Sequence, residues 1–344
     1  MLFHWFYGGK GESRSALVMK NLIKERSSQA VSCAYLKGAS YEVGSLRPIS
    51  EIEELKKDTN TLDTLLTLGL ETFSLSTKKP VELAKSSIEK TVDRAGVDRS
   101  QIDEVIYATS GYAMSGKPWC PVHYSKELNS LLLSLNLSHC TGMGVSFSQC
   151  VNIIAAIELA VGLVESGRKK NVLVFSADCL SPHESRLVDN GISVISDAAA
   201  SCIVSSEQNN GYFIEAINKN IDWGLLEIDS ASDFSTFFKR TAEGISGAVQ
   251  QLNQSLGRVG SDYEQLLTNS VNLSILRIIS RQTKVDVDRI YSKNISRFAH
   301  CDCSDILINL ADYELEKEGE KSDPVLLLAS GPYVWGAMSL VRMC

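Results

Sequence analysis

The sequence has no excess of basic residues and no concentrated basic cluster. It holds 34 Lys and Arg against 41 Asp and Glu, a net charge of -7 at neutral pH and a pI near 5.4. Proteins that bind nucleic acids or anionic membranes normally carry a concentrated basic surface. We therefore expect neither nucleic acid nor a membrane surface as a partner.

Long hydrophobic runs and a secretion signal are also missing. The most apolar stretch, residues 151–166, is interrupted by Asn152, Glu158 and Glu165, so no window reaches the ~18 apolar residues of a membrane span. The opening MLFHWFYGG lacks a basic region and a cleavage site. The nine cysteines are scattered and odd in number, which argues against a disulfide framework. We predict a cytoplasmic protein with reduced cysteines.

Strands and helices alternate along most of the chain, which predicts a layered α/β architecture. The same order recurs, so we predict an N-terminal half at 29–207 and a C-terminal half at 208–344, with residues 1–28 left unassigned as an extension or first element. The predicted strands are 30–36, 104–108, 142–147, 171–177, 201–205, 212–218, 265–268, one near 290, 325–329 and 335–342. The predicted helices begin at Pro80, ending before Gly96, and span 124–135, 151–166, 237–256, 272–283 and 305–316.

Cys150 ends the segment GMGVSFSQC and precedes the most apolar helix of the chain. The start of a helix offers unpaired N–H groups and the positive end of the helix dipole, which favour a thiolate. We therefore predict that Cys150 is a nucleophile with a thiolate stabilised by this position. The alternative is a plain buried cysteine, since cysteine is common in protein cores.

Three segments carry a family resemblance. Residues 148–178, 190–204 and 326–343 read SQCVNIIAAIELAVGLVESGRKKNVLVFSAD, NGISVISDAAASCIV and LLLASGPYVWGAMSLVRM. They resemble, in order, the active-site segment, the glycine-rich segment before a strand and the closing strands of the β-ketoacyl-ACP synthase III branch of the thiolase superfamily. The resemblance implies a five-layered α/β/α/β/α thiolase fold with two pseudo-symmetric halves and two buried helices between the sheets.

The resemblance also implies the partners of Cys150, with a departure from the usual pattern. The family has a His in a Pro-His-Gln-Ala-Asn motif and an Asn in a later Gly-Asn motif. Here TNSVN at 268–272 places Asn269 where the His is expected, and RFAH at 297–300 places His300 where the Asn is expected. We expect His300 to act as the base and Asn269 as a neutral hydrogen-bond donor.

Other roles for these residues stay open. A lone histidine such as His300 is often structural, and an Asn at a strand end such as Asn269 is often a turn or cap residue. We expect Asn272 to cap the next helix. Backbone N–H groups of Cys150 and Gly331 are the expected oxyanion hole.

The implied activity is acyl transfer. Cys150 would accept an acyl group from a CoA or acyl-carrier-protein thioester and pass it on, by Claisen-type C–C condensation in fatty-acid-like, polyketide or other specialised biosynthesis. Ester or amide formation and a non-catalytic subunit of a heterodimeric synthase are the alternatives. We expect a homodimer or a heterodimer with a related subunit.

No cofactor is expected beyond the phosphopantetheine thioester substrate. The run from His300 to Cys303 and the pair His139 and Cys140 contain metal-ligating residue types, but their separation fits no usual zinc spacing. No dinucleotide fingerprint or phosphate loop occurs. We therefore predict no metal and no redox cofactor.

Overall fold

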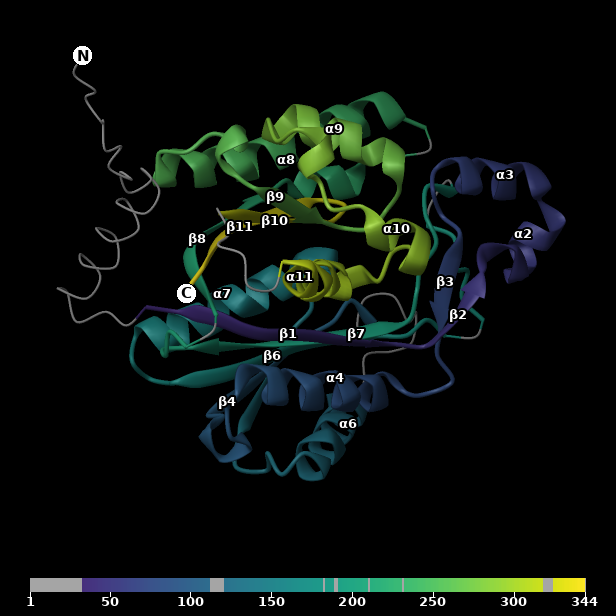
Figure 1. Cartoon of the computed structure of the whole chain (residues 1–344). Helices are drawn as coiled ribbons and strands as arrows, with labels where there is room; N and C mark the ends of the chain where they lie inside the picture. The colour runs from purple at the N-terminus through teal and green to yellow at the C-terminus, as the bar shows by residue number, and fades with distance from the viewer. Residues whose placement is uncertain are drawn as a thin grey trace, which may run out of the picture.

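Five alternating layers of helices and strands make up the protein (Figure 1). The computed structural model describes residues 33–111, 121–181, 183–188, 191–209, 211–230, 232–317 and 324–343. The expected first element at 1–28 and Asn190 of the glycine-rich segment lie outside the described residues.

The N-terminal part of the described chain supplies two outer layers and one central helix. Its elements are β1 (Tyr35–Val43), β2 (Ser45–Pro48), α2 (Glu53–Lys57), α3 (Thr59–Thr67), β3 (Thr72–Leu75), α4 (Pro80–Ala95), β4 (Glu104–Ala108), α6 (Pro121–Ser134), β5 (Thr141–Val145), α7 (Asn152–Glu165), β6 (Asn171–Asp178) and β7 (Ala198–Ser205). In Figure 1, α4 and α6 lie outside the sheet of β1, β4, β6 and β7, and α7 lies on its inner side.

The C-terminal part repeats this arrangement on the opposite side. Its elements are β8 (Tyr212–Ile221), α8 (Phe234–Leu256), β9 (Gln265–Thr268), α9 (Leu273–Thr283), α10 (Lys293–Phe298), α11 (Asp305–Glu316), β10 (Val325–Ser330) and β11 (Val334–Arg342). Helices α8 and α9 form the outer layer, and α11 lies beside α7 between the sheets (Figure 1).

Sheet topology shows the same connectivity twice. The strands run in the order β5-β4-β6-β7-β1-β8-β11-β10-β9, and β1 and β8 are joined through only two residue pairs. In the first five strands β7 is antiparallel to both neighbours, and in the last four β11 is antiparallel to both neighbours. A parallel bridge between Leu266 and Ile290 takes the place of a fifth strand beside β9. The two parts therefore share one topology, while the exact boundary at 207 and 208 stays a prediction.

The central helix α7 is held by apolar contacts on several faces. Ile153, Ile154 and Ile157 are completely buried, and burial of each such side chain contributes ~1.5–3 kcal/mol. On β11, a Cβ at Gly336 would lie 2.8 Å from Val151 Cγ1, so this glycine allows close packing against the start of α7. This packing fixes the position of the neighbouring Cys150.

Several expected elements are confirmed with their bounds. Helix α4 begins at Pro80 and ends at Ala95, and it is capped by Gly96, whose φ of 62° suits a glycine. Strands β4 and β9 and helix α11 have the predicted bounds. Asn272 caps α9, because its side chain accepts a hydrogen bond from the Ile275 N–H. Clear start and stop residues and strong apolar periodicity explain this agreement.

The predicted end of the first strand at residue 36 is wrong. Strand β1 continues to Val43 through Gly38, which has a φ of 63° and lies at a register shift between Lys37 and Ser40. A Cβ at Gly38 would lie 2.6 Å from the Thr91 carbonyl oxygen of α4. The glycine therefore permits helix packing within a strand and does not mark a loop.

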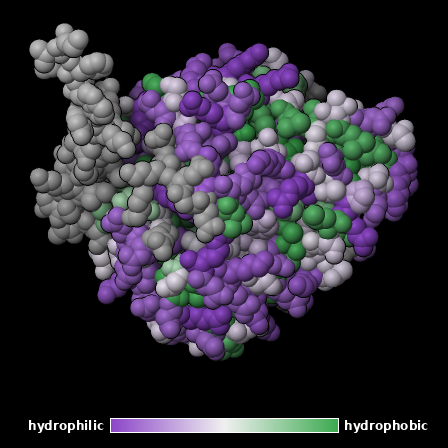
Figure 2. Space-filling view, in the orientation of Figure 1, coloured by the Kyte–Doolittle hydropathy of each residue, from purple (hydrophilic) through white to green (hydrophobic). Residues whose placement is uncertain are grey.

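The face of the molecule in Figure 2 is mainly hydrophilic, with its hydrophobic residues in separate patches. Among the described residues, no helix has the length and apolar character needed to cross a membrane. This face therefore offers mainly polar contacts to its surroundings.

Candidate active site

The thiol of Cys150 lies on a strained turn between β5 and α7. Gln149, directly before it, has a φ of 49°, a conformation that non-glycine residues rarely adopt. Asn152 braces the turn, since its Oδ1 accepts from the Ser148 N–H at 2.7 Å and its Nδ2 donates to the Thr109 carbonyl at 3.0 Å. The sequence places the thiol before the helix, and these bonds fix it there.

His300 is held from the opposite half of the chain. Its N–H donates to the Val194 carbonyl at 2.9 Å, and its own carbonyl accepts from the Ser196 N–H at 2.8 Å. Ala299 before it has a φ of 54° and a ψ of -145°. The backbone around His300 is therefore fixed by a segment about 100 residues earlier.

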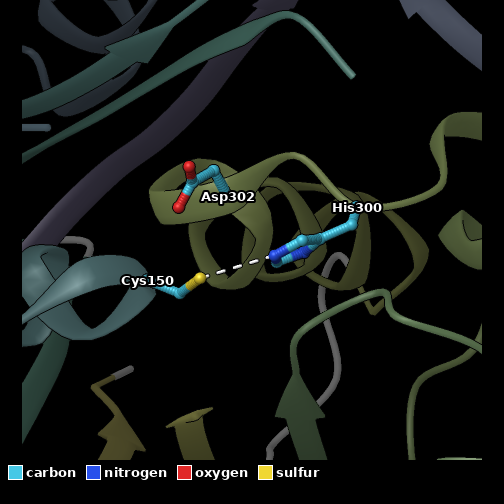
Figure 3. A group of neighbouring side chains, drawn as sticks. All are labelled: Cys150, His300 and Asp302. Atoms are coloured by element: carbon cyan, nitrogen blue, oxygen red, sulfur yellow. Dashed lines mark hydrogen bonds between the residues drawn. The ribbon is translucent and has the colours of Figure 1, made fainter. Parts of the chain in front are cut away.

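Cys150, His300 and Asp305 form a continuous hydrogen-bonded series. The Cys150 Sγ lies 3.4 Å from His300 Nε2, and His300 Nδ1 lies 2.6 Å from Asp305 Oδ2 (Figure 3 shows the first contact). Asp305 is held by the N–H groups of Cys301 and Ser270 at 2.8 and 2.9 Å. The Asp305 carboxylate accepts a hydrogen bond from the Nδ1–H of His300, so the unprotonated Nε2 can accept a proton from sulfur.

The electrostatics of the thiol differ from the sequence-based expectation. Burial and the carboxylates of Asp302, Asp305 and Asp178 raise the pKa of Cys150 well above its usual range. The prediction of a stabilised thiolate is therefore wrong for the resting site. Desolvation and the three carboxylates, which disfavour the thiolate, outweigh the favourable effect of the helix start. Burial lowers the pKa of His300, but the charge and hydrogen bond of Asp305, with Asp302, give a net increase.

Asp302 lies beside both the thiol and the imidazole (Figure 3). It is 6% exposed, has a φ of 52°, and its Oδ1 accepts a hydrogen bond from Ser110 Oγ at 2.7 Å. Asp178 lies behind it and accepts from the Ser110 N–H at 3.1 Å. Burial and the charge of Asp302 raise the pKa of Asp178 to about 7. The site therefore carries a second acidic group besides Asp305.

Asn269 presents a buried amide that is satisfied on one side. It is 4% exposed, and its Oδ1 accepts from the Ser330 N–H at 2.7 Å. Its Nδ2 has no hydrogen-bond partner among the described residues. The next residue, Ser270, donates to the carboxylate that orients His300. The Nδ2 of Asn269 is thus available as a hydrogen-bond donor.

Gly331 lies against the thiol-bearing turn, but its N–H is already used. It donates to the Val334 carbonyl at 2.8 Å within the turn between β10 and β11. A Cβ on Gly331 would lie 3.3 Å from the Ser148 carbonyl oxygen. The expected oxyanion role of this N–H is therefore contradicted, because closing the hairpin turn consumes the donor.

Cys150, His300 and Asp302 bring their ligand atoms within 4.8 Å of one another, a spacing that could hold one metal ion. His139 and Cys140 are instead occupied locally, since both contact the Ile102 carbonyl at 3.1 Å. The expected absence of a metal cofactor stays a prediction.

Sequence reasoning missed two acids of the site. Asp302 and Asp305 follow His300 within five residues, in the run HCDCSD. In the sequence alone, this run shows metal-ligating residue types, and Asp305 reads as the start of a helix. The spacing of His300 and Asp305 was an available signal, because residues flanking a helix start can face each other across the turn.

Comparisons of sequence place the chain near one family. The family model of 3-oxoacyl-[acyl-carrier-protein (ACP)] synthase III matches residues 147–220. The β-ketoacyl-[acyl-carrier-protein] synthase III of Acholeplasma laidlawii is 21% identical over 270 residues, which cover 76% of this chain and 82% of that protein. The enzyme of the same name from Campylobacter fetus is 33% identical over 134 residues, 39% of this chain and 38% of that protein.

Comparisons of structure agree on the fold. The 3-oxoacyl-[acyl-carrier-protein] synthase III of Aquifex aeolicus superposes with a TM-score of 0.74 at 17% identity, covering 90% of this chain and all of that chain. The acyltransferase ChlB3 gives 0.77 at 14% identity, covering 90% and 98%. A variant of OleA from Xanthomonas campestris gives 0.73 at 13% identity, covering 90% and 98%. The predicted thiolase fold is confirmed.

Proposed function

Because the chain belongs, as a distant member, to the β-ketoacyl-ACP synthase III-like branch of the thiolase superfamily, we propose that it transfers acyl groups through a thioester on Cys150. The observation that carries this proposal is the contact series from Cys150 through His300 to Asp305. A nucleophile, a base and a group that orients the base are the parts that covalent acyl transfer requires.

The first half-reaction follows from the raised pKa of the thiol. Since the resting thiol keeps its proton, His300 Nε2 takes that proton as the sulfur attacks the carbonyl carbon of the donor thioester. The new C–S bond forms to Cys150, the donor C–S bond breaks, and the departing sulfur takes the proton from His300. Asp305 keeps the imidazole oriented and stabilises its charged form.

The developing negative charge on the acyl oxygen needs hydrogen-bond donors. The Nδ2 of Asn269 is buried without a described partner, and we assign it to that oxygen together with the Cys150 N–H. This assignment keeps the exchanged roles that the sequence suggested, with His300 as base and Asn269 as neutral donor. A purely structural His300 would not need a sulfur atom at 3.4 Å from Nε2.

The donor and the assembly follow from the relatives. Their names specify acyl-carrier-protein substrates, so we propose a carrier-protein or CoA thioester as the donor. The resemblance predicts a Claisen-type condensation as the second half-reaction, in fatty-acid-like or specialised metabolism, and this stays a prediction. Dimer formation and a cytoplasmic location also stay predictions. The complete series of three side chains opposes a purely non-catalytic subunit.

Intact mass measurement tests the proposal directly. The purified chain is incubated with acyl-CoA and acyl-carrier-protein thioesters of several chain lengths, and a mass increase equal to one acyl group is expected. Cys150→Ala should abolish the increase, whereas Cys179→Ala, which removes another partly exposed thiol, should preserve it. An increase that survives Cys150→Ala, or no increase with any donor, would falsify the proposal.

A further inference from the structure

Three side chains of metal-ligating types converge in the active site. The sulfur of Cys150, a ring nitrogen of His300 and a carboxylate oxygen of Asp302 all lie within 4.8 Å of one another (Figure 3). His300 and Asp302 come from the run HCDCSD, and the thiol comes from a turn 150 positions before the histidine. The fold therefore completes a ligand set that the run contains only in part.

The spacing of the sulfur and the nitrogen fits zinc. Zinc binds sulfur at ~2.3 Å and imidazole nitrogen at ~2.0–2.1 Å, and tetrahedral angles then separate these two ligand atoms by ~3.5 Å. The Cys150 Sγ and His300 Nε2 are 3.4 Å apart. A carboxylate ligand would lie ~3.4–3.6 Å from both atoms, so Asp302, now within 4.8 Å, needs to approach by at most ~1.4 Å.

Hydrogen bonds around the ligands already orient them. His300 Nδ1 lies 2.6 Å from Asp305 Oδ2, so a carboxylate holds the ring with Nε2 toward the sulfur. Asp302 Oδ1 accepts a hydrogen bond from Ser110 Oγ at 2.7 Å. Zinc-binding histidines usually donate their other N–H to a carboxylate, and ligating carboxylates are themselves hydrogen-bonded. The site therefore has the outer contacts that zinc ligands require.

The negative charge around the thiol has no partner from Lys or Arg. In the part of the chain that the structure describes, neither Asp302 nor Asp178 forms an ion pair, and Asp305 pairs with His300. Within the same residues, Oδ2 of Asp178 is buried without a hydrogen-bond partner. A divalent cation would compensate these carboxylates. Thiolate and imidazole ligands favour Zn²⁺, whereas Mg²⁺ prefers oxygen ligands.

From this geometry we propose that a zinc ion binds Cys150, His300 and Asp302 and reversibly blocks acylation, as an inhibitor and not as a cofactor. On binding, the Cys150 S–H bond breaks, the proton passes to solvent, and the sulfur bonds to the ion. Three protein ligands leave the fourth position to water. The ion occupies the sulfur and Nε2, the two atoms that acyl transfer uses, so the inhibitory part of the inference rests on the proposed function.

Zinc binding is measured first, without an acyl donor. The full-length chain is treated with a chelator, the chelator is removed, and Zn²⁺ is titrated against a chromophoric chelator of known affinity. One ion should bind per chain, and Mg²⁺ should not displace it. Co²⁺ then serves as a spectroscopic probe, because charge-transfer absorption from a thiolate to Co²⁺ shows whether sulfur is a ligand.

Two variants and a control locate the site. Cys150→Ala should abolish the thiolate absorption. Asp302→Asn should weaken zinc binding by about tenfold or more, because loss of even an outer hydrogen-bond partner costs ~10–100-fold. Asn also tolerates the φ of 52° at this position. Cys303→Ala is the matched control: it removes a second thiol, 3.2 Å from Ser110 Oγ, and should leave zinc affinity unchanged.

Inhibition is measured second, by intact mass after addition of acetyl-CoA or acetyl-carrier protein below saturation. Zinc at about ten times its Kd should slow adduct formation about tenfold, and excess chelator should restore the rate. The inference is overturned if no ion binds, if zinc affinity and thiolate absorption persist in both variants, or if zinc-bound enzyme is acylated at the same rate. Absence of an adduct with chelator present would instead overturn the proposed acyl transfer, and the zinc titration would still test the site.

Discussion

The two halves of the chain share a topology, but the starts of their central helices carry different chemistry. In the first half, α7 is almost entirely apolar and follows a single reactive thiol at Cys150. In the second half, α11 follows His300 and contains buried Asp305, Asn309 and Asp312. Equivalent places in the repeated topology therefore supply the nucleophile on one side and the base with its acids on the other.

This difference shows how a duplicated fold can divide one site between its halves. Backbone strain occurs at both places, since Gln149, Ala299 and Asp302 are three of the five described non-glycine residues with positive φ. Such conformations persist where surrounding structure holds them, and they are frequent at functional sites. Neither half contains the complete series, so the site depends on how the two central helices lie beside each other.

Loss of the base should give the largest effect. His300→Ala should lower turnover by about 10⁴-fold, because it removes the ring nitrogen that contacts the Cys150 thiol and accepts its proton. Slow acylation of Cys150 should remain. Acyl-donor consumption and intact mass measure the two effects. His139→Ala, which changes a histidine of the first half that contacts the Ile102 carbonyl, is the control. Unchanged turnover in His300→Ala would contradict the division of the site between the halves.

Removing the charge that orients the base should give the next largest effect. Asp305→Asn should lower kcat/KM by about 10²- to 10³-fold, because the amide no longer fixes the imidazole in the required tautomer. Asp305 raises the pKa of His300, so its loss lowers that pKa. The neutral base then exists at lower pH, and the rising limb of the pH–rate profile should move to lower pH. A limb that stays in place or moves to higher pH would oppose this role.

The neutral donor should contribute less than the base and its acid. Asn269→Ala should lower turnover by about 10²-fold, as expected for loss of one oxyanion donor. Removal of Nδ2 should change the free energy of unfolding little, because this atom has no described hydrogen-bond partner. Removal of Oδ1 takes away the acceptor of the Ser330 N–H. Asn272→Ala is the contrasting variant: it removes a helix cap, so it should lower stability by ~1 kcal/mol and affect turnover less. The reverse pattern would reject the assignment of Asn269.

One helical glycine in each half gives the smallest predicted effect, on stability alone. A Cβ at Gly244 of α8 would collide with the buried ring of Trp335, so Gly244→Ala should lower the free energy of unfolding by ~1–3 kcal/mol. A Cβ at Gly162 of α7 meets nothing within 4 Å, so Gly162→Ala should raise it by up to ~1 kcal/mol. Denaturant unfolding measures both, and changes of the same sign would contradict the packing.

Much of the fold was predictable because local signals are strong. The apolar run of β6, the Pro80 and Gly96 signals of α4 and the periodicity of α11 depend on nearby residues only. The end of the first strand was misplaced because the chain continues as β1 through Gly38, which packs against α4, a helix far along the chain. Local sequence cannot show which distant backbone approaches a glycine.

The site was predictable in part. Cys150, His300 and Asn269 were named from sequence. The structure places Cys150 in contact with His300. Ser270, the residue after Asn269, donates its N–H to Asp305. The acids Asp302 and Asp305 were missed because aspartates near helix starts are common capping residues. Only their positions relative to the thiol distinguish them from such caps.

The sequence by itself determined the alternation of strands and helices, the apolar central helix and the thiol before it, since these depend on residue type and short spacing. The tertiary structure alone decided the protonation state of that thiol. Burial and three carboxylates, two from the run after His300 and one from β6, raise its pKa, against the effect of the helix start. Desolvation and Coulomb interactions depend on distances in space, and residues 150 positions apart in the chain meet at 3.4 Å here.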